Sequence, residues 1–194
     1  MVSRQYARDD LGNPPAHPFT YTIRCGMPAI EWLMTNSLNS HGFRQEAPAS
    51  ILVLVDAPQG SALRELEHMD SSGRLVIVTT HNPCPEYWED LWSLEPAILL
   101  VGDSLGVELH DAIRRAAYGE RYRLTPDYMM VLAPQERLTL RCIARGWSIE
   151  RIAEVRGVAL KTVSNSLTAI YVKLKLPDRS AAMLYYWGRL DLLD

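Results

Sequence analysis

The sequence predicts two consecutive domains: an α/β domain built on a parallel sheet, and an all-α domain of four helices. In residues 21–120, short apolar runs rich in Val and Ile alternate with helix-like segments. This alternation is typical of strands buried on both faces of a parallel sheet. In residues 132–194, apolar positions recur at helical spacing between glycines that can end helices.

In the first domain, strands are expected at Tyr21–Cys25, Ile51–Val55, Leu75–Thr79 and Ala97–Val101. The intervening segments have helical spacing, and helices are expected at Pro28–Asn39, Ser61–Met69, Glu86–Leu94 and Val107–Tyr118. Such a domain binds ligands or reacts at the carboxyl ends of its strands. The residues expected at those ends include Asp56, Thr79, Thr80 and Gly102.

The second domain is expected to begin with a helix at about Pro134–Arg145. Ser148 can cap the next helix, Ile149–Arg156, and Gly157 can close it. A third helix starts at Leu160. A helix, a glycine-containing turn and a second helix form the helix-turn-helix pattern, in which the second helix enters the major groove of DNA.

This third helix is expected to have two distinct faces. The apolar positions assigned to its buried face are Leu160, Val163, Leu167, Ile170, Val172 and Leu174. The opposite face carries basic and short polar side chains, which suit a major groove: Lys161, Thr162, Ser164, Asn165 and Thr168.

The C-terminal domain closely resembles the DNA-binding domain of LuxR/NarL-type regulators. The matching residues are Leu132–Glu136, Ala144–Gly146, Ile152–Ala153, Gly157–Val158, Lys161–Val163, Asn165, Lys173–Leu174 and Arg179–Ser180. The resemblance implies base reading by Ser164, Asn165 and Thr168, and phosphate contacts by Lys161, Thr162 and Lys173. Two residues depart from the family pattern: Ser166 replaces a common His, and Ala133 replaces a common Thr. Without a hydroxyl at position 133, the first helix is expected to fray or start later.

Charge is divided unevenly between the two domains. Residues 132–194 hold 10 Lys and Arg against 6 Asp and Glu, net +4, whereas residues 1–131 hold 10 against 17, net −7; the sum is the −3 of the whole chain. The basic domain is the expected partner of DNA phosphates. The acidic domain is expected to face away from DNA or to meet another protein. A helical bundle that binds no nucleic acid is the alternative interpretation.

Composition limits the class of protein. Residues 1–20 lack the apolar core of a signal peptide and are expected to form a flexible extension. The sequence has no apolar run long enough to span a membrane, so a cytoplasmic protein is expected. Three widely spaced cysteines favour neither a disulfide framework nor a metal site. No nucleophile with a base and no phosphate-binding loop stands out, so we expect neither an enzyme nor a cofactor.

The N-terminal domain resembles a response-regulator receiver, which implies a shortened flavodoxin-like fold. The resemblance covers roughly residues 21–120 and rests on Leu54–Asp56 followed by Pro58 and Gly60, on Val78–Thr79, on Asp111–Arg114 and on Gly119–Glu120. In this family Asp56 would be the phosphoacceptor and Thr79 the switch hydroxyl.

Several parts of the receiver pattern are missing. No acidic residue lies between Asp10 and Glu31, whereas a receiver needs an acidic pair after its first strand to hold Mg²⁺. Gly102 stands in place of the family's Lys, and Leu99 in place of its switch aromatic residue. Residues 43–50 leave room for a short second strand but not for the helix that should follow it. These departures predict a pseudo-receiver that does not use aspartyl phosphate, with Asp56 capping the following turn or helix.

Aromatic residues suggest a dimer surface. Trp88 and Trp92 lie four residues apart in one predicted helix, and Tyr185 and Trp187 lie in the expected last helix, Ala181–Leu193. A two-fold dimer would read an inverted repeat in double-stranded DNA. The expected linker, residues 121–131, is short enough to keep the domains in contact.

The leading hypothesis is therefore a dimeric, sequence-specific transcription regulator that is independent of phosphorylation. Two alternatives remain open: a phosphorylation-switched regulator that uses Asp56, and a module that forms heterodimers with another regulator without reading DNA. A small ligand near Asp56 and Gly102 is compatible with any of these.

Overall fold

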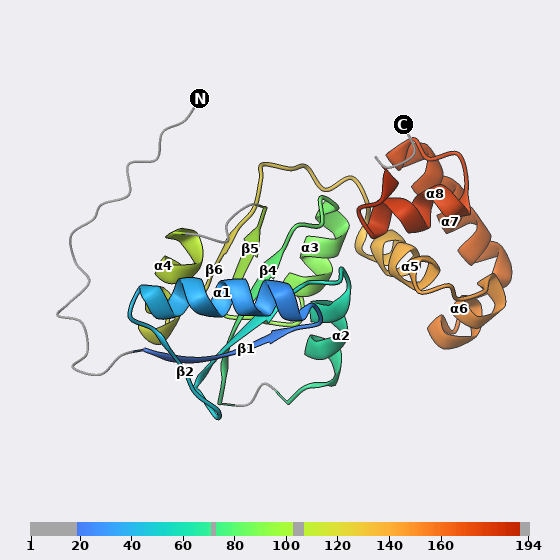
Figure 1. Ribbon diagram of the computed structural model, residues 1–194. Coiled ribbons are helices and arrows are strands. Elements are labelled where there is room, and N and C mark those ends of the chain that lie inside the picture. Colours follow the sequence, from blue (N-terminus) through green and yellow to red (C-terminus); the bar gives the residue numbers. More distant parts are fainter. Residues whose placement is uncertain (1–18, 71–72, 103–106, 191–194) are drawn as a thin grey trace.

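The computed structural model describes residues 19–70, 73–102 and 107–190, so most of the expected N-terminal extension lies outside the described residues. It confirms the expected fold class, a parallel α/β domain followed by a helical domain (Figure 1). The described strands form one parallel sheet of six strands in the order β2-β1-β3-β4-β5-β6. No helix in the described ranges is long and apolar enough to cross a membrane.

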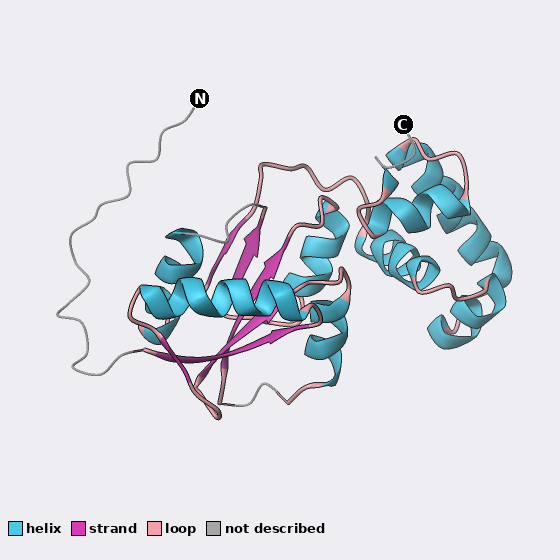
Figure 2. Cartoon of the chain, viewed as in Figure 1, coloured by secondary structure: helices cyan, strands magenta, loops and turns pink. Residues whose placement is uncertain are grey.

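The strands and helices of the first domain alternate along the chain (Figure 2). The strands are β1 (Thr20–Cys25), β2 (Arg44–Gln45), β3 (Ile51–Val55), β4 (Leu75–Thr80), β5 (Ile98–Val101) and β6 (Tyr122–Leu124). The helices are α1 (Pro28–Ser40), α2 (Ser61–His68), α3 (Pro85–Trp92) and α4 (Val107–Ala117). Each expected strand and helix of this domain forms within one or two residues of its predicted bounds.

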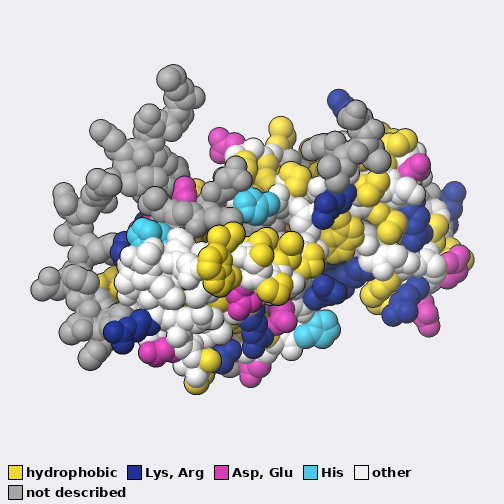
Figure 3. Space-filling model, in the orientation of Figure 1, with side chains coloured by type: hydrophobic (Ala, Val, Ile, Leu, Met, Phe, Trp, Pro, Cys, Tyr) yellow, Lys and Arg dark blue, Asp and Glu magenta, His cyan; other side chains and the backbone are white. Residues whose placement is uncertain are grey.

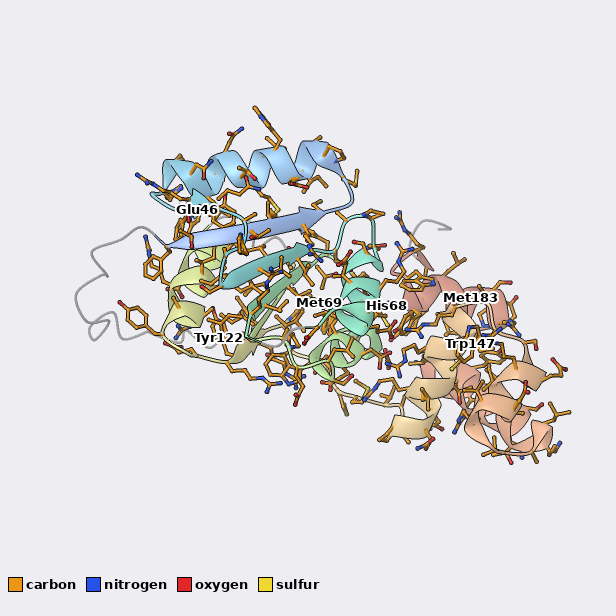
Figure 4. The ribbon with its side chains drawn as sticks, turned by 90° about the horizontal axis from the view of Figure 1, so that it is seen from below. Glu46, His68, Met69, Tyr122, Trp147 and Met183 are labelled. Carbon is orange, nitrogen blue, oxygen red and sulfur yellow. The ribbon has the colours of Figure 1, made fainter. Side chains whose placement is uncertain are left out.

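The sheet is buried between two layers of helices because its central strands are apolar on both faces. All five residues of β3 are buried. Ile51, Val53 and Val55 belong to the core beneath α1 and α4, and Leu52 and Leu54 belong to the core beneath α2 and α3. Viewed from below, α1 and α2 lie on opposite faces of the sheet (Figure 4). The helical domain lies beside α2.

Two connections depart from a regular alternation of strand and helix. The chain passes from β2 to β3 through residues 46–50 without a helix, as the short spacing predicts. Strand β6, which was not expected from the sequence, lies inside the expected linker and pairs with β5. Arg115 holds β6 against α4 through a cation–π contact, with its guanidinium carbon 4.7 Å from the Tyr122 ring centroid. The linker therefore starts as part of the sheet and is not a free tether.

Four helices form the C-terminal domain: α5 (Pro134–Ala144), α6 (Ile149–Arg156), α7 (Leu160–Leu174) and α8 (Arg179–Tyr186). The Ser148 hydroxyl caps α6 by accepting a hydrogen bond from the Arg151 amide, as expected. The expected late start of α5 is wrong. The Glu136 carboxylate accepts a hydrogen bond from the Ala133 amide at 2.8 Å, and this contact fixes the first turn without a hydroxyl at position 133.

The two domains meet through α3 and the helices α5 and α8. Asp90 of α3 is 3% exposed. Its carboxylate accepts a hydrogen bond from the Tyr186 hydroxyl at 2.6 Å and faces Arg137 and Arg141 of α5 at 3.4 and 3.6 Å. The acidic α3 thus meets the basic domain of the same chain, an intrachain contact that the sequence did not predict.

Further contacts extend this junction to α8. The Tyr185 hydroxyl donates to the Glu86 carboxylate at 2.7 Å, and the side-chain amide of Asn82 donates to the Tyr186 carbonyl at 3.0 Å. The Trp187 ring packs so closely on Gly60 that a β-carbon there would lie 2.7 Å from it. One continuous apolar cluster extends from the sheet into the helical domain.

The aromatic residues predicted for a dimer surface make contacts within one chain. Trp88 is 3% exposed, and its indole nitrogen donates to the Asn82 carbonyl. Tyr185 and Trp187 contact the first domain, as described above. Trp92 lies under Arg121, with the guanidinium carbon 5.0 Å from the ring centroid. Domain docking thus engages Tyr185 and Trp187, whereas Trp88 is buried in its own domain and Trp92 stays half-buried.

Tyr186→Phe tests the junction. The variant keeps the ring but removes the hydroxyl bonded to buried Asp90, so we expect the free energy of unfolding to fall by about 2 kcal/mol. Urea denaturation measures this change. Tyr171→Phe is the matched control, because its half-buried hydroxyl belongs to α7 and lies outside the junction. Equal stability of the two variants would show that the Tyr186 hydroxyl does not hold the domains together.

Candidate nucleic-acid interface

Helix α7 is held in place by a narrow apolar face. Val163, Leu167 and Ile170 are buried against the other helices of the domain. The predicted apolar face is wrong at two positions: Leu160 is 51% exposed and Val172 is 73% exposed. Leu160 is the first residue of the helix, and Val172 lies about 200° around the helix from buried Ile170, so it points away from the core.

The predicted base-reading and phosphate residues of α7 lie on its outer side. Lys161, Thr162, Asn165 and Thr168 are exposed, and Ser164 is half-buried. Helices α6 and α7 lie on the side of the helical domain away from the sheet (Figure 1). The domain junction therefore leaves this face of α7 open.

Two of the expected reading hydroxyls are turned back toward the helix. The Ser164 hydroxyl donates to the Leu160 carbonyl at 3.1 Å, and the Thr168 hydroxyl donates to the Ser164 carbonyl at 3.1 Å. Both oxygens can still accept a hydrogen bond from a base, but their protons are engaged. Among the three expected base-reading residues, Asn165 is the one whose amide can both donate and accept outward.

Lys173 is paired within the domain. Its ammonium nitrogen lies 2.6 Å from the Glu136 carboxylate of α5, and this contact is the main reason that the pKa of Glu136 is lowered. Lys173 thus fastens the end of α7 to the start of α5. To contact a DNA phosphate, the Lys173 ammonium group would have to leave Glu136 or bind both groups at once.

Sequence reasoning missed a polar network behind α7. Thr139 of α5 is fully buried and donates to the Gln135 carbonyl at 2.9 Å. The Ser166 hydroxyl donates to Thr139 at 3.3 Å, and Arg156 of α6 donates to the Gln135 side chain at 2.8 Å and also to Thr139. Ser166 therefore faces inward. The signal available in the sequence was Thr139, a lone polar residue among the buried positions of α5.

Lys and Arg side chains lie over the helical domain and where it meets the sheet domain (Figure 3). Several of these cations are already paired. Arg137 and Arg141 face Asp90, and Arg145 is paired with Glu67 of α2. The net positive charge of this domain thus overstates what is free to meet DNA phosphates.

The second candidate site, at the carboxyl ends of the strands, is centred on Asp56. One of its oxygens accepts hydrogen bonds from the Gly60 and Ala62 amides at 2.8 and 3.1 Å. The other accepts from the Thr80 and Tyr87 hydroxyls at 2.8 and 2.9 Å. Burial raises the pKa of this carboxyl, and the hydrogen bonds, led by that of Thr80, act against the rise. Asp56 thus caps the first turn of α2.

Thr80, not Thr79, is the hydroxyl beside Asp56. Strand pairing aligns Val55 with Thr79, which places Thr80 next to Asp56, and this one-residue shift corrects the sequence alignment. The buried Thr79 hydroxyl has no hydrogen-bond partner among the described residues.

The residues do not fit the Mg²⁺ of a receiver. Both Asp56 oxygens are engaged by protein donors, and Cys25 and Gly26 occupy the places of the acidic pair after β1. A β-carbon at Gly26 would lie 2.7 Å from Pro58, so the loop after β3 fills the space beside it. A hard cation needs several free oxygen ligands, and this arrangement does not supply them.

Aromatic side chains cover Asp56. The Tyr87 ring meets Tyr186 edge-on at a centroid distance of 5.5 Å and lies 5.9 Å from the Trp187 ring. Side chains of both domains therefore pack around the Tyr87 side of Asp56.

Asp56→Ala distinguishes a structural capping residue from a phosphoacceptor. It leaves two buried hydroxyls and two amides without an acceptor, so we expect the free energy of unfolding to fall by about 3 kcal/mol or more. Chemical denaturation compares it with Asp127→Ala, which removes an exposed linker carboxylate. Equal effects of the two changes would contradict the capping role.

Comparisons with known proteins find matches to the helical domain alone and to most of the chain. Residues 130–186 match the family model of bacterial regulatory proteins of the luxR family. Over 59 residues the chain is 42% identical to the probable HTH-type transcriptional regulator GfsR of Streptomyces halstedii, covering 30% of this chain and 24% of GfsR. Over 147 residues it is 24% identical to the transcriptional regulatory protein DesR of Bacillus subtilis, covering 72% and 73% of the two chains.

The response regulator VraR of Staphylococcus aureus is 28% identical over 91 residues, covering 40% of this chain and 44% of VraR. The chain therefore matches less than half the length of GfsR and of VraR.

The fold is similar to solved structures of RcsB. A structure of two RcsB dimers bound to two parallel DNAs superposes with a TM-score of 0.57 at 16% identity, covering 89% of this chain and 99% of RcsB. RcsB from Salmonella enterica serovar Typhimurium, bound to promoter rprA, gives a TM-score of 0.54 at 18% identity over 88% and 98% of the chains. Residues 130–186 thus form a domain of the luxR family, and the whole chain resembles LuxR/NarL-type response regulators with a receiver-like first domain.

Proposed function

We propose that this chain is a sequence-specific DNA-binding transcription regulator that needs no aspartyl phosphate and binds inverted repeats as a dimer. The observation that carries the proposal is the open face of α7 within a domain that matches the luxR family. Regulators similar to this chain include DesR and VraR, and RcsB has been solved bound to DNA.

The side chains on α7 support base reading in the major groove. Asn165 is exposed at the centre of the helix, and an amide can make two hydrogen bonds to adenine. Lys161 and Thr162 are exposed at the N-terminal end of the same helix, where they can meet phosphates and fix the position of the domain on the duplex.

The surroundings of Asp56 support independence from phosphorylation. A phosphoryl group would have to displace at least one of four hydrogen bonds to the carboxylate and enter a space covered by Tyr87 and Tyr186. It would also add close to two negative charges where Gly102 replaces the family's Lys. Each of these effects disfavours the phosphorylated state.

The proposal of a dimer rests on symmetry and on the RcsB dimers. A single α7 contacts a few base pairs, and two copies related by a two-fold axis would double that contact on an inverted repeat. The aromatic side chains at the domain junction are already in use, so the dimer requires other surfaces. A heterodimer with another regulator would use the same free surfaces.

Selection of bound duplexes from a random DNA pool, using unmodified protein at near-physiological salt, tests the DNA-reading proposal. We expect an inverted repeat to be enriched, and Asn165→Ala to lose preference among sequences. Asn36→Ala, at an exposed position on α1, is the matched control and should select the same repeat. If nothing is enriched, the chain does not read DNA alone, and a module acting through heterodimers becomes the better explanation.

Incubation with a small phosphodonor and Mg²⁺ tests the second part of the proposal. We expect the intact mass to stay unchanged and the selected duplex to be bound with the same affinity before and after incubation. A phosphorylated species that is lost in Asp56→Asn would establish the phosphorylation switch instead.

A further inference from the structure

We propose that the outer face of α7 contains an apolar contact for the 5-methyl group of thymine, centred on Val172. This inference rests on the proposed function, because it names a base that the same helix recognises. Val172 is 73% exposed near the end of α7, so it adds little to the core. A β-branched residue is also a weaker helix former than most long side chains, so local folding does not explain its presence.

Val172 borders a shallow hollow on the reading side of the helix. The hollow has a volume of about 440 Å³ and is lined by Asn165, Thr168, Ala169, Val172 and Lys173. Ala169 and Val172 lie three residues apart and present only methyl groups. The charge of Lys173 is offset by Glu136 at 2.6 Å, which leaves the apolar side chains to dominate this end of the hollow.

Thr168 adds to the same apolar surface. Its hydroxyl donates to the Ser164 carbonyl at 3.1 Å, so its methyl group is the free end of the side chain. Thymine is the base that presents a methyl group in the major groove, and apolar contacts with Ala, Thr or similar side chains recognise it. The hollow thus has the chemistry of a methyl-binding surface, with the amide of Asn165 at its other end.

The spacing along α7 limits where this thymine lies. Val172 is seven residues beyond Asn165, which corresponds to about 10 Å along the helix axis. Base pairs are stacked at about 3.4 Å. The thymine should therefore lie within about three base pairs of the base contacted by Asn165.

The test replaces each thymine of the selected duplex with deoxyuridine, one position at a time, which removes only the 5-methyl group. Dissociation constants are measured by fluorescence anisotropy. At one position near the base read by Asn165, we expect the wild-type protein to bind about four-fold more weakly, the effect of burying one methyl-sized group. Val172→Ala should show a similar loss on the thymine duplex and no further loss on the deoxyuridine duplex.

Val155→Ala is the matched control, because Val155 is 62% exposed on α6 and lies outside the hollow. It should remain as sensitive to deoxyuridine as the wild type. The thermal unfolding midpoint of Val172→Ala should be no lower than that of the wild type, because alanine is the better helix former at this exposed position, and this separates an effect on binding from a loss of folding.

Two results would overturn the inference while leaving the proposed function intact. The wild type could bind every deoxyuridine duplex as tightly as the parent, or Val172→Ala could retain the full four-fold sensitivity to deoxyuridine. If random selection enriches no duplex at all, both the proposed function and this inference fail.

Discussion

The arrangement of the molecule depends on two carboxylates, those of Glu86 and Asp90, which are 1% and 3% exposed between the domains. Taking a carboxylate out of water is costly unless hydrogen bonds and opposite charges compensate. The partners of Asp90, which are Tyr186 and two arginines of α5, all come from the helical domain. Glu86 accepts a hydrogen bond from Tyr185 of the same domain. These buried carboxylates keep their hydrogen bonds and opposite charges only when the two domains dock in this orientation, so they specify how the domains dock.

This orientation has opposite consequences for the two candidate sites. It draws the end of α8 over the carboxyl ends of the strands, where Tyr87 contacts Asp56 on one side and the aromatic side chains of α8 on the other. Asp56, which is 5% exposed, is thus part of the packed interior. The same docking uses α5 and α8, so the outer face of α7 stays exposed.

Docking also changes the electrostatics of the helical domain. Three of its arginines are directed toward acidic residues of α2 and α3, and Lys173 is paired with Glu136. The outer face of α7 is left with Lys161, an amide, back-bonded hydroxyls and methyl groups. Docking thus lowers the number of cations of this domain that are free to meet an anionic partner.

The sequence by itself determined the order of strands and helices, the helix-turn-helix and the absence of a helix between β2 and β3, because these follow from local periodicity, caps and spacing. It also favoured the capping role of Asp56, since no acidic pair follows the first strand and Gly102 stands where a phosphorylation site has a Lys. Only the tertiary structure decided that Thr80 lies beside Asp56, because strand register sets that pairing. It also decided that Trp88 is buried in the first domain, that Tyr185 serves domain docking, and that β6 lies within the expected linker. These features depend on contacts between residues far apart in the chain, which periodicity in one segment does not encode.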